Sequence, residues 1–173
     1  MQGGNKTLLC FDWDNFFGSL FRDFGPDNVR LEERVDKIFS WVNTEVGKII
    51  SIGGFVFAPE HLNILHKRIF LKHDFNFLIC PKKEGGQDVV DENIISFCEW
   101  AMKHPEVGYL CLASGDNDYF PLFEKAGKLG VKRALVVPTL NCLAKIPKGK
   151  RLVDLIDSHP LTGRKMVLRS DLL

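Results

Sequence analysis

Residues 108–121, GYLCLASGDNDYFP, run from an apolar stretch into two aspartates, Asp116 and Asp118. A similar stretch lies near the start of the chain, where residues 8–17, LLCFDWDNFF, contain Asp12 and Asp14 directly after an apolar run. Carboxylates beside a core are costly unless a positive group lies among them. The two stretches therefore predict buried strands with acidic ends, and they pose the question of what positive group those ends face.

Short apolar runs alternate with helical patterns along the rest of the chain, which predicts βαβ units and a mostly parallel sheet covered on both sides. We expect an α/β three-layer sandwich with a central, doubly wound sheet, in which the first and fourth strands are central neighbours. The expected strands are 7–11, 48–57, 75–80, 108–113 and 131–137. The expected helices are 31–46, 60–70, 88–103 and 119–129.

The composition indicates an ordinary globular chain. It has 173 residues, of which 45% are hydrophobic and 26% charged, with a net charge of +1. We expect one domain over 1–158, followed by a tail, 159–173, that is an arm, an oligomer contact or a frayed end. The chain shows no leader pattern, no membrane-length apolar span, and five cysteines without a CxxC pair, which indicates a reducing, cytoplasmic setting. No residue pattern predicts a zinc site.

Three acidic groups are placed where they can converge. In an open parallel sheet, ligands bind beyond the carboxyl ends of the strands, where the strand order reverses. The ends of the first and fourth predicted strands carry one pair each, and GGQDVVDE (85–92) adds a third group at the start of a helix, after two glycines. The third group consists of Asp88, Asp91 and Glu92, which share one face of the first helical turn.

Each group taken alone has a structural explanation. Asp88 can complement a helix N-terminus, Asp118 can cap a helix, and Asp116 can close an Asx-turn. Asp14 can be a turn residue and Asn15 a cap. The three groups together instead favour a divalent-metal site, because hard oxygen ligands suit Mg²⁺ or Mn²⁺. Phosphoryl transfer is the chemistry that uses such a cluster.

These residues also resemble a known family, the NYN domain, which is the LabA-like branch of the PIN-like nuclease superfamily. The resemblance covers roughly residues 6–157. It rests on Asp12 to Asn15, on the helix-opening Asp88 after Lys83, Gly85 and Gly86, and above all on residues 114–130, SGDNDYFPLFEKAGKLG.

The resemblance implies a PIN-like sandwich and a metal-dependent ribonuclease. We expect an endonuclease, because an open crevice need not recognise the end of a strand. It assigns the catalytic and metal-binding acids to Asp12, Asp88, Asp116 and Asp118, with Asn15 assisting. Two departures stand out. Asp14 is an additional acid, and the apolar Ile94 and Ile95 occupy positions where the family often has a further acid, so that Asp91 or Glu92 becomes the substitute ligand.

Two alternatives stay open at this stage. FDWDNF also resembles the nucleophile motif of haloacid-dehalogenase-type phosphatases, in which Asp12 would be the nucleophile, although Phe16 replaces the expected Thr or Val. A catalytically silent RNA-binding NYN domain is the other. RNA is the expected partner in two of the three cases, no membrane is expected, and homo-oligomerisation is left open. The first candidates for contacts to RNA are Lys82, Lys83, Lys148, Lys150 and Arg151.

Overall fold

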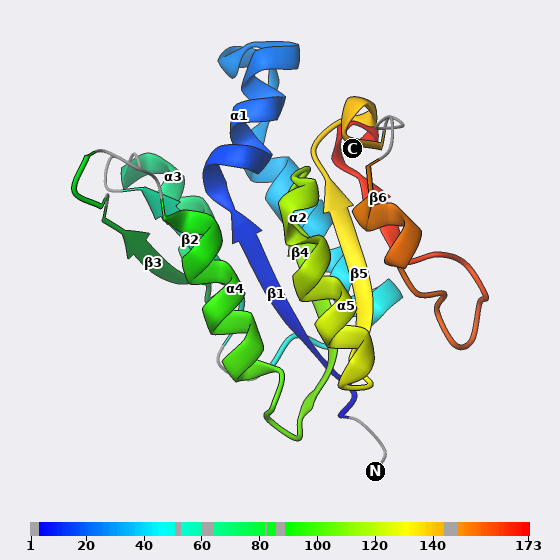
Figure 1. Cartoon of the computed structure of the whole chain (residues 1–173). Helices are drawn as coiled ribbons and strands as arrows, with labels where there is room; N and C mark the ends of the chain where they lie inside the picture. The colour runs from blue at the N-terminus through cyan, green and yellow to red at the C-terminus, as the bar shows by residue number, and fades with distance from the viewer. Residues whose placement is uncertain (1–3, 51–52, 60–63, 82, 86–88, 144–148) are drawn as a thin grey trace.

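The protein, seen here as a computed structural model, is a six-stranded parallel sheet with helices on both faces (Figure 1). The structure describes residues 4–50, 53–59, 64–81, 83–85, 89–143 and 149–173. The strand order is β3-β2-β1-β4-β5-β6, and each neighbouring pair is parallel. The strands are β1 (Lys6–Asp12), β2 (Phe55–Pro59), β3 (Asn76–Cys80), β4 (Val107–Ala113), β5 (Lys132–Val137) and β6 (Val167–Arg169).

Within the described residues, five α-helices form the outer layers. They are α1 (Trp13–Phe24), α2 (Leu31–Trp41), α3 (Ile64–Leu71), α4 (Val90–Ala101) and α5 (Phe120–Lys128). In Figure 1, α4 and α5 lie in front of the sheet, while α2 lies behind it. The α/β sandwich expected from the sequence is confirmed, and so is the central pairing of the first and fourth expected strands, β1 and β4.

A cluster of aromatic rings around Phe11 packs β1 against α1 and α3. Its ring lies 5.5 Å from that of Phe16 and 6.0 Å from that of Phe17, both on α1, and 5.3 Å from that of Phe70 on α3. Edge-to-face and offset pairs of this kind stabilise a core beyond their buried area. The cluster therefore fixes α1 against the end of β1, where Asp12 lies.

Helix α1 was not expected from the sequence. Trp13, Phe16, Phe17 and Leu20 are all buried on it, and their spacing is that of one helical face. The apolar run of β1 is interrupted at Asp12, Asp14 and Asn15 and resumes at once with Phe16 and Phe17, so hydrophobicity alone does not separate the strand from the helix. The signal for this change was Asp12 itself, whose side chain caps the helix by accepting from the backbone N–H of Asn15.

The second expected strand, 48–57, is wrong at its start, because β2 begins only at Phe55. Before it, Ile49 makes a single parallel bridge to Thr7. Gly53 then has a φ of +84°, a left-handed conformation that interrupts an extended strand and that glycine adopts without strain. The regular strand therefore starts after this turn.

Other boundaries differ by less. The expected helix 31–46 consists of α2 followed by a π-helical segment, Val42–Val46. The expected helices 60–70 and 88–103 correspond to α3 and α4, although residues 60–63 and 88 lie outside the described residues.

The segment after residue 158, whose role the sequence left open, contributes β6, which pairs with β5. Directly before this segment, Asp157 makes a bidentate ion pair with Arg133 of β5, with N–O distances of 2.8 and 3.0 Å. Further along, the buried guanidinium of Arg34 on α2 donates to the backbone oxygen of Ser170. The C-terminal segment is thus bound to both the sheet and α2. Among the described residues, no helix has the length and apolar character needed to span a bilayer.

Candidate metal centre

Asp12 lies at the point where β1 ends and α1 begins. Its Oδ1 accepts from the backbone N–H of Asn15 at 3.3 Å, and only 2% of the residue is exposed. Burial raises the pKa of Asp12 from 3.8 to about 7, although its hydrogen bonds from Tyr119 and Asn15 act in the opposite direction. Asp91 and Asp116 add to the increase by repulsion. Asp12 is therefore a carboxyl group that needs a nearby positive charge to ionise readily.

Tyr119 connects Asp12 with a second acid. Its hydroxyl lies 2.8 Å from Oδ2 of Asp12 and 2.8 Å from Oδ1 of Asp91, and its side chain is buried. A phenol donates one proton, so it cannot satisfy two ionised carboxylates equally. Burial and the two acids raise the pKa of Tyr119 far above its ordinary value, which keeps the hydroxyl protonated.

Sequence reasoning did not single out Tyr119. The available signal was a hydroxyl-bearing aromatic directly after Asp118, at a place where the apolar face of a helix begins. That signal was weak, because an aromatic residue at this place is equally expected from its contribution to the apolar face.

Asn15 joins the ends of the two central strands. Its Oδ1 accepts from the Oγ of Ser114 at 3.1 Å and from the backbone N–H of Gly115 at 2.7 Å. Gly115 itself is required by close packing, because a Cβ there would lie 2.3 Å from the Sγ of Cys142. Asn15 therefore fixes the loop after β4 relative to α1. The resemblance to the NYN domain implies that this residue assists catalysis.

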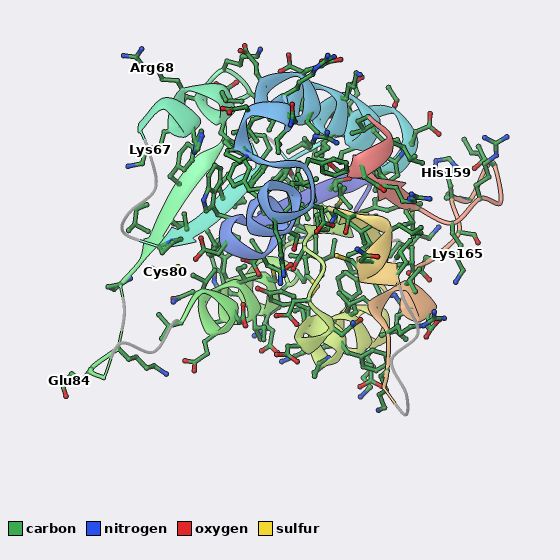
Figure 2. All side chains as sticks on the ribbon, turned by 90° about the horizontal axis from the view of Figure 1, so that it is seen from above. Lys67, Arg68, Cys80, Glu84, His159 and Lys165 are labelled. Carbon is green, nitrogen blue, oxygen red and sulfur yellow. The ribbon has the colours of Figure 1, made fainter. Side chains whose placement is uncertain are left out.

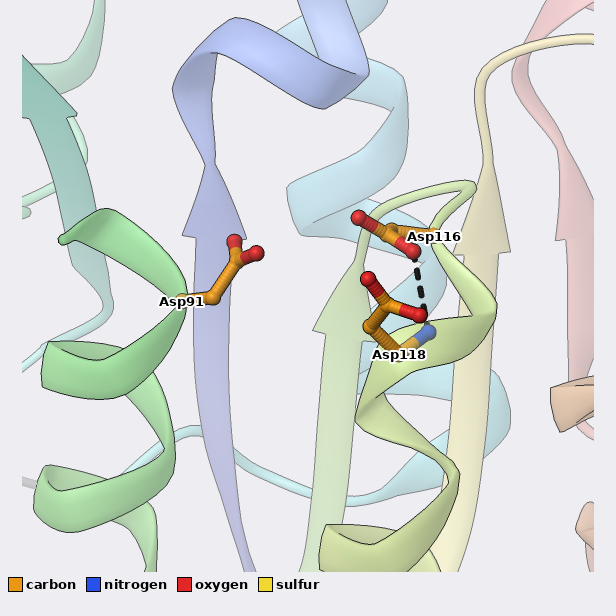
Figure 3. Close-up of side chains that lie close together, drawn as sticks. All are labelled: Asp91, Asp116 and Asp118. Atoms are coloured by element: carbon orange, nitrogen blue, oxygen red, sulfur yellow. Dashed lines mark hydrogen bonds between the residues drawn. The ribbon is translucent and has the colours of Figure 1, made fainter. Parts of the chain in front are cut away.

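Asp116 and Asp118 follow in that loop, and Asp91 approaches them from the first turn of α4. One carboxylate oxygen from each of the three lies within 4.8 Å of the others. Figure 3 shows the three carboxyl groups directed into a common space between α4 and the loop. Partial burial, together with repulsion from Asp118 and Asp91, raises the pKa of Asp116.

Asp116 also has the structural role that its position allowed. Its Oδ1 accepts from the backbone N–H of Asp118 at 2.9 Å, which caps the short helical segment η3 (Asn117–Tyr119). A capping role and a ligand role do not compete here, since a carboxylate has two oxygens and several lone pairs.

A cavity of about 310 Å³ lies beside this cluster. Three of the acids described above line it together with further side chains from α1 and α4. The lining residues are Asp12, Asp14, Asn15, Val90, Asp91 and Asp116. Carboxylates from β1, α1, α4 and the loop after β4 thus meet at one opening, at the carboxyl ends of the central strands.

The remaining predicted residues are placed differently. Glu92, the other substitute ligand, pairs with Lys83 at 2.6 Å and is absent from the cavity lining. Figure 2 shows the molecule from above, with Glu84, the residue after Lys83, on a loop that projects away from the body of the molecule. Asp88, Lys82 and Lys148 lie outside the described residues.

The two basic candidates near the C-terminus also differ from each other. Arg151 is bound to Asp154 through two N–O contacts of 2.6 and 3.0 Å. Lys150 instead lies over the ring of Phe120, 5.1 Å from its centroid.

Comparison with known proteins extends the fold assignment but not the function. No family model and no curated protein matches the chain. A crystal structure of a protein of unknown function from Vibrio parahaemolyticus matches with a TM-score of 0.66 and 15% sequence identity, covering 98% of this chain and 94% of that one. At this identity the likeness concerns the fold, which the two proteins share over nearly their full lengths.

Proposed function

We propose that this protein is a ribonuclease that uses Mg²⁺ or Mn²⁺ to hydrolyse phosphodiester bonds in RNA. The observation that carries the proposal is the meeting of Asp91, Asp116 and Asp118 within 4.8 Å, next to the buried Asp12. The donors are carboxylate oxygens without thiolate or imidazole among them, and this donor set fits a hard divalent cation. A cation held by these acids would polarise the phosphodiester and favour deprotonation of an attacking water.

The side chains around the cluster have supporting tasks in this proposal. Tyr119 holds the carboxyl groups of Asp12 and Asp91 at a fixed separation through its two 2.8 Å contacts. Asn15 fixes the position of the loop that carries Asp116 relative to α1. Rigid, pre-positioned donors lose little entropy when a charged ligand arrives, which favours both metal binding and catalysis.

Asp91 is the natural fourth acid of this site. It lies in the first turn of α4, three residues before the buried Ile94. Ile94 occupies a position where the NYN domain often has a further acid, so a nearby carboxylate is needed to replace that ligand. Its Oδ1 lies 2.8 Å from the hydroxyl of Tyr119, and its carboxylate belongs to the group of three. We therefore assign to Asp91 the role for which the sequence offered either Asp91 or Glu92.

The phosphatase alternative has less support. A nucleophilic Asp12 would need an accessible carboxylate oxygen, whereas Oδ1 accepts from Asn15, Oδ2 contacts the hydroxyl of Tyr119, and 2% of the residue is exposed. A catalytically silent RNA-binding domain would retain the fold without needing four acids at one opening.

The proposal is tested by incubating the protein with labelled single-stranded RNA, single-stranded DNA and a generic phosphatase substrate, each with Mn²⁺ and with chelator. We expect cleavage of RNA that needs the metal and is lost in Asp116→Asn. Asp74→Asn is the matched control, because the exposed Asp74 precedes β3 at the opposite edge of the sheet and its left-handed backbone, φ +57°, suits asparagine.

Three results would argue against the nuclease. Hydrolysis of the phosphatase substrate alone would favour the alternative in which Asp12 is the nucleophile. Binding of RNA without any cleavage would favour the silent domain. Equal activity of the parent and Asp116→Asn would remove the carboxylate cluster from the chemistry.

A further inference from the structure

A lysine and an aromatic ring lie directly beside the acidic loop. Phe120 begins α5 two residues after Asp118, so their Cα atoms are at most about 7 Å apart. Lys150, which is exposed, lies with its Nζ 5.1 Å from the centroid of this ring. A cation near the face of an aromatic ring is attracted by the ring's quadrupole but keeps its full charge.

A hydrogen bond holds the segment that carries Lys150 against the acidic loop. The backbone N–H of Leu152, at the start of η5 (Leu152–Leu155), donates to the Oδ1 of Asn117 at 2.9 Å. Asn117 lies between Asp116 and Asp118. The segment is thus held against the loop at Asn117 and at Phe120, one on each side of Asp118, so Lys150 lies beside the loop that carries Asp116 and Asp118.

The charge of Lys150 is available in a way that the charges of two other expected RNA-binding residues are not. Lys83 is paired with Glu92, and Arg151 is bound by both oxygens of Asp154. Within the part of the chain that the structure describes, Lys150 has no carboxylate within ion-pair distance, although three carboxylates gather nearby. Its contact is an uncharged ring, which orients the ammonium without neutralising it.

We propose that Lys150 binds a phosphate of the RNA strand next to the phosphate that is cleaved, and that Phe120 positions it. This inference rests on the proposed function for the identity of the strand. The carboxylates repel a phosphate until a cation is bound, so a fixed cation at the rim gives the flanking phosphate a favourable contact. Phe120 acts through Lys150 and is a positioning residue.

The chain contains a matched control for this pair. Lys132 of β5 lies 5.9 Å from the ring centroid of Tyr109 on β4, which is also a lysine over an aromatic ring. These two residues are paired near the starts of their strands, at the edge of the sheet opposite the acidic loop. Removing either lysine changes the net charge equally, so a difference between the two variants depends on position and not on total charge.

The test measures binding apart from cleavage. A short fluorescein-labelled oligouridylate is titrated with the parent, Lys150→Ala, Lys150→Arg and Lys132→Ala, using Ca²⁺ as the divalent ion and anisotropy as the readout over a range of salt concentrations. We expect Lys150→Ala to weaken binding about five- to tenfold and to reduce the salt slope by about 0.7, the value for one phosphate contact on a single strand. Lys150→Arg should retain most of the affinity, and Lys132→Ala should match the parent.

A second pair of variants tests the positioning role. Phe120→Leu keeps an apolar side chain but removes the ring under Lys150, so its loss of affinity should be smaller than that of Lys150→Ala and should disappear when Lys150 is already alanine. Circular dichroism shows whether the variants remain folded.

The outcomes separate this inference from the proposed function. Parent-like affinity and salt slope in Lys150→Ala would overturn the inference even if the protein cleaves RNA, and so would a parent that does not bind the oligonucleotide. Binding that depends on Lys150, without cleavage in Mn²⁺, would support the inference and contradict the nuclease.

Discussion

At the scale of single residues, the unusual feature is a buried carboxyl group with a pKa near neutrality. The folded state raises the pKa of Asp12 from 3.8 to about 7, chiefly through burial. Between these two values the folded protein binds a proton that the unfolded chain does not. The contribution of Asp12 to the free energy of unfolding of the metal-free protein therefore decreases as the pH rises from about 4 to about 7.

We predict that Asp12→Asn removes this pH dependence. In chelator, the variant should gain stability relative to the parent as the pH rises across this interval, by on the order of 3 kcal/mol in total. Urea unfolding of both proteins at about pH 5 and about pH 8 measures the difference, and the contributions of other titrating groups cancel between them. Parallel pH dependences in the two proteins would show that Asp12 does not titrate in this range.

The residue scale also shows what the sequence could not reveal. The positions of Asp12, Asp116 and Asp118 at strand ends were predictable, because the apolar runs that precede them are unmistakable. The contacts of Tyr119 were not, since they depend on how closely α4 approaches β1, a distance that no local pattern encodes. For the same reason the sequence could not choose between Asp91 and Glu92, which are neighbours on one turn.

At the scale of elements, Asn15 couples the first turn of α1 to the loop after β4. Asn15→Ala would leave the cap of α1 intact, because that bond uses the backbone N–H of residue 15. It would remove the acceptor of the Oγ of Ser114, which is buried, and of the backbone N–H of Gly115, which is partly buried.

We predict that Asn15→Ala lowers the free energy of unfolding by about 1–3 kcal/mol, the cost of leaving such groups without a partner. It should also speed amide exchange at Gly115. Asn28→Ala serves as the control, because Asn28 is exposed and donates one bond, to the backbone oxygen of Phe24. Equal stability of the two variants would mean that Asn15 does not hold the loop.

Element boundaries were the least predictable part of the fold. Apolar residues resume in α1 directly after Asp14 and Asn15, and Gly53 lies inside a run that reads as one strand. In both places the backbone changes conformation while the apolar pattern continues. Periodicity detects burial there, but it does not show which element carries the buried residues.

At the scale of the whole molecule, the C-terminal segment after residue 158 belongs to the sheet, because β6 pairs with β5. The ion pair between Arg133 of β5 and Asp157 lies directly before this segment. Burial alone would raise the pKa of Asp157, but the hydrogen bonds and charge of Arg133 outweigh that effect and hold the pKa below its ordinary value. A depressed carboxyl pKa stabilises the folded state above the unfolded pKa, and this contribution is lost as the pH falls through the folded value.

We predict that Asp157→Asn lowers stability at neutral pH by about 1 kcal/mol, a modest effect because solvent partly screens the pair. The difference from the parent should shrink below about pH 4, where the parent's carboxylate also becomes protonated. Asp154→Asn, which breaks an exposed ion pair with Arg151, should leave the unfolding curve unchanged. A difference between parent and Asp157→Asn that persists in acid would contradict an ionic origin.

The candidate metal centre is the feature on which the proposed activity depends, and thermal unfolding with and without Mn²⁺ tests it most directly. Without metal, Asp116→Asn should be as stable as the parent or more so, by about 1 kcal/mol, because repulsion among the clustered acids is relieved. Saturating Mn²⁺ should raise the Tm of the parent and of Asp74→Asn, since a ligand stabilises the state that binds it. The Tm of Asp116→Asn should rise much less. Equal shifts in all three proteins, or no shift in any, would contradict a metal site at Asp91, Asp116 and Asp118.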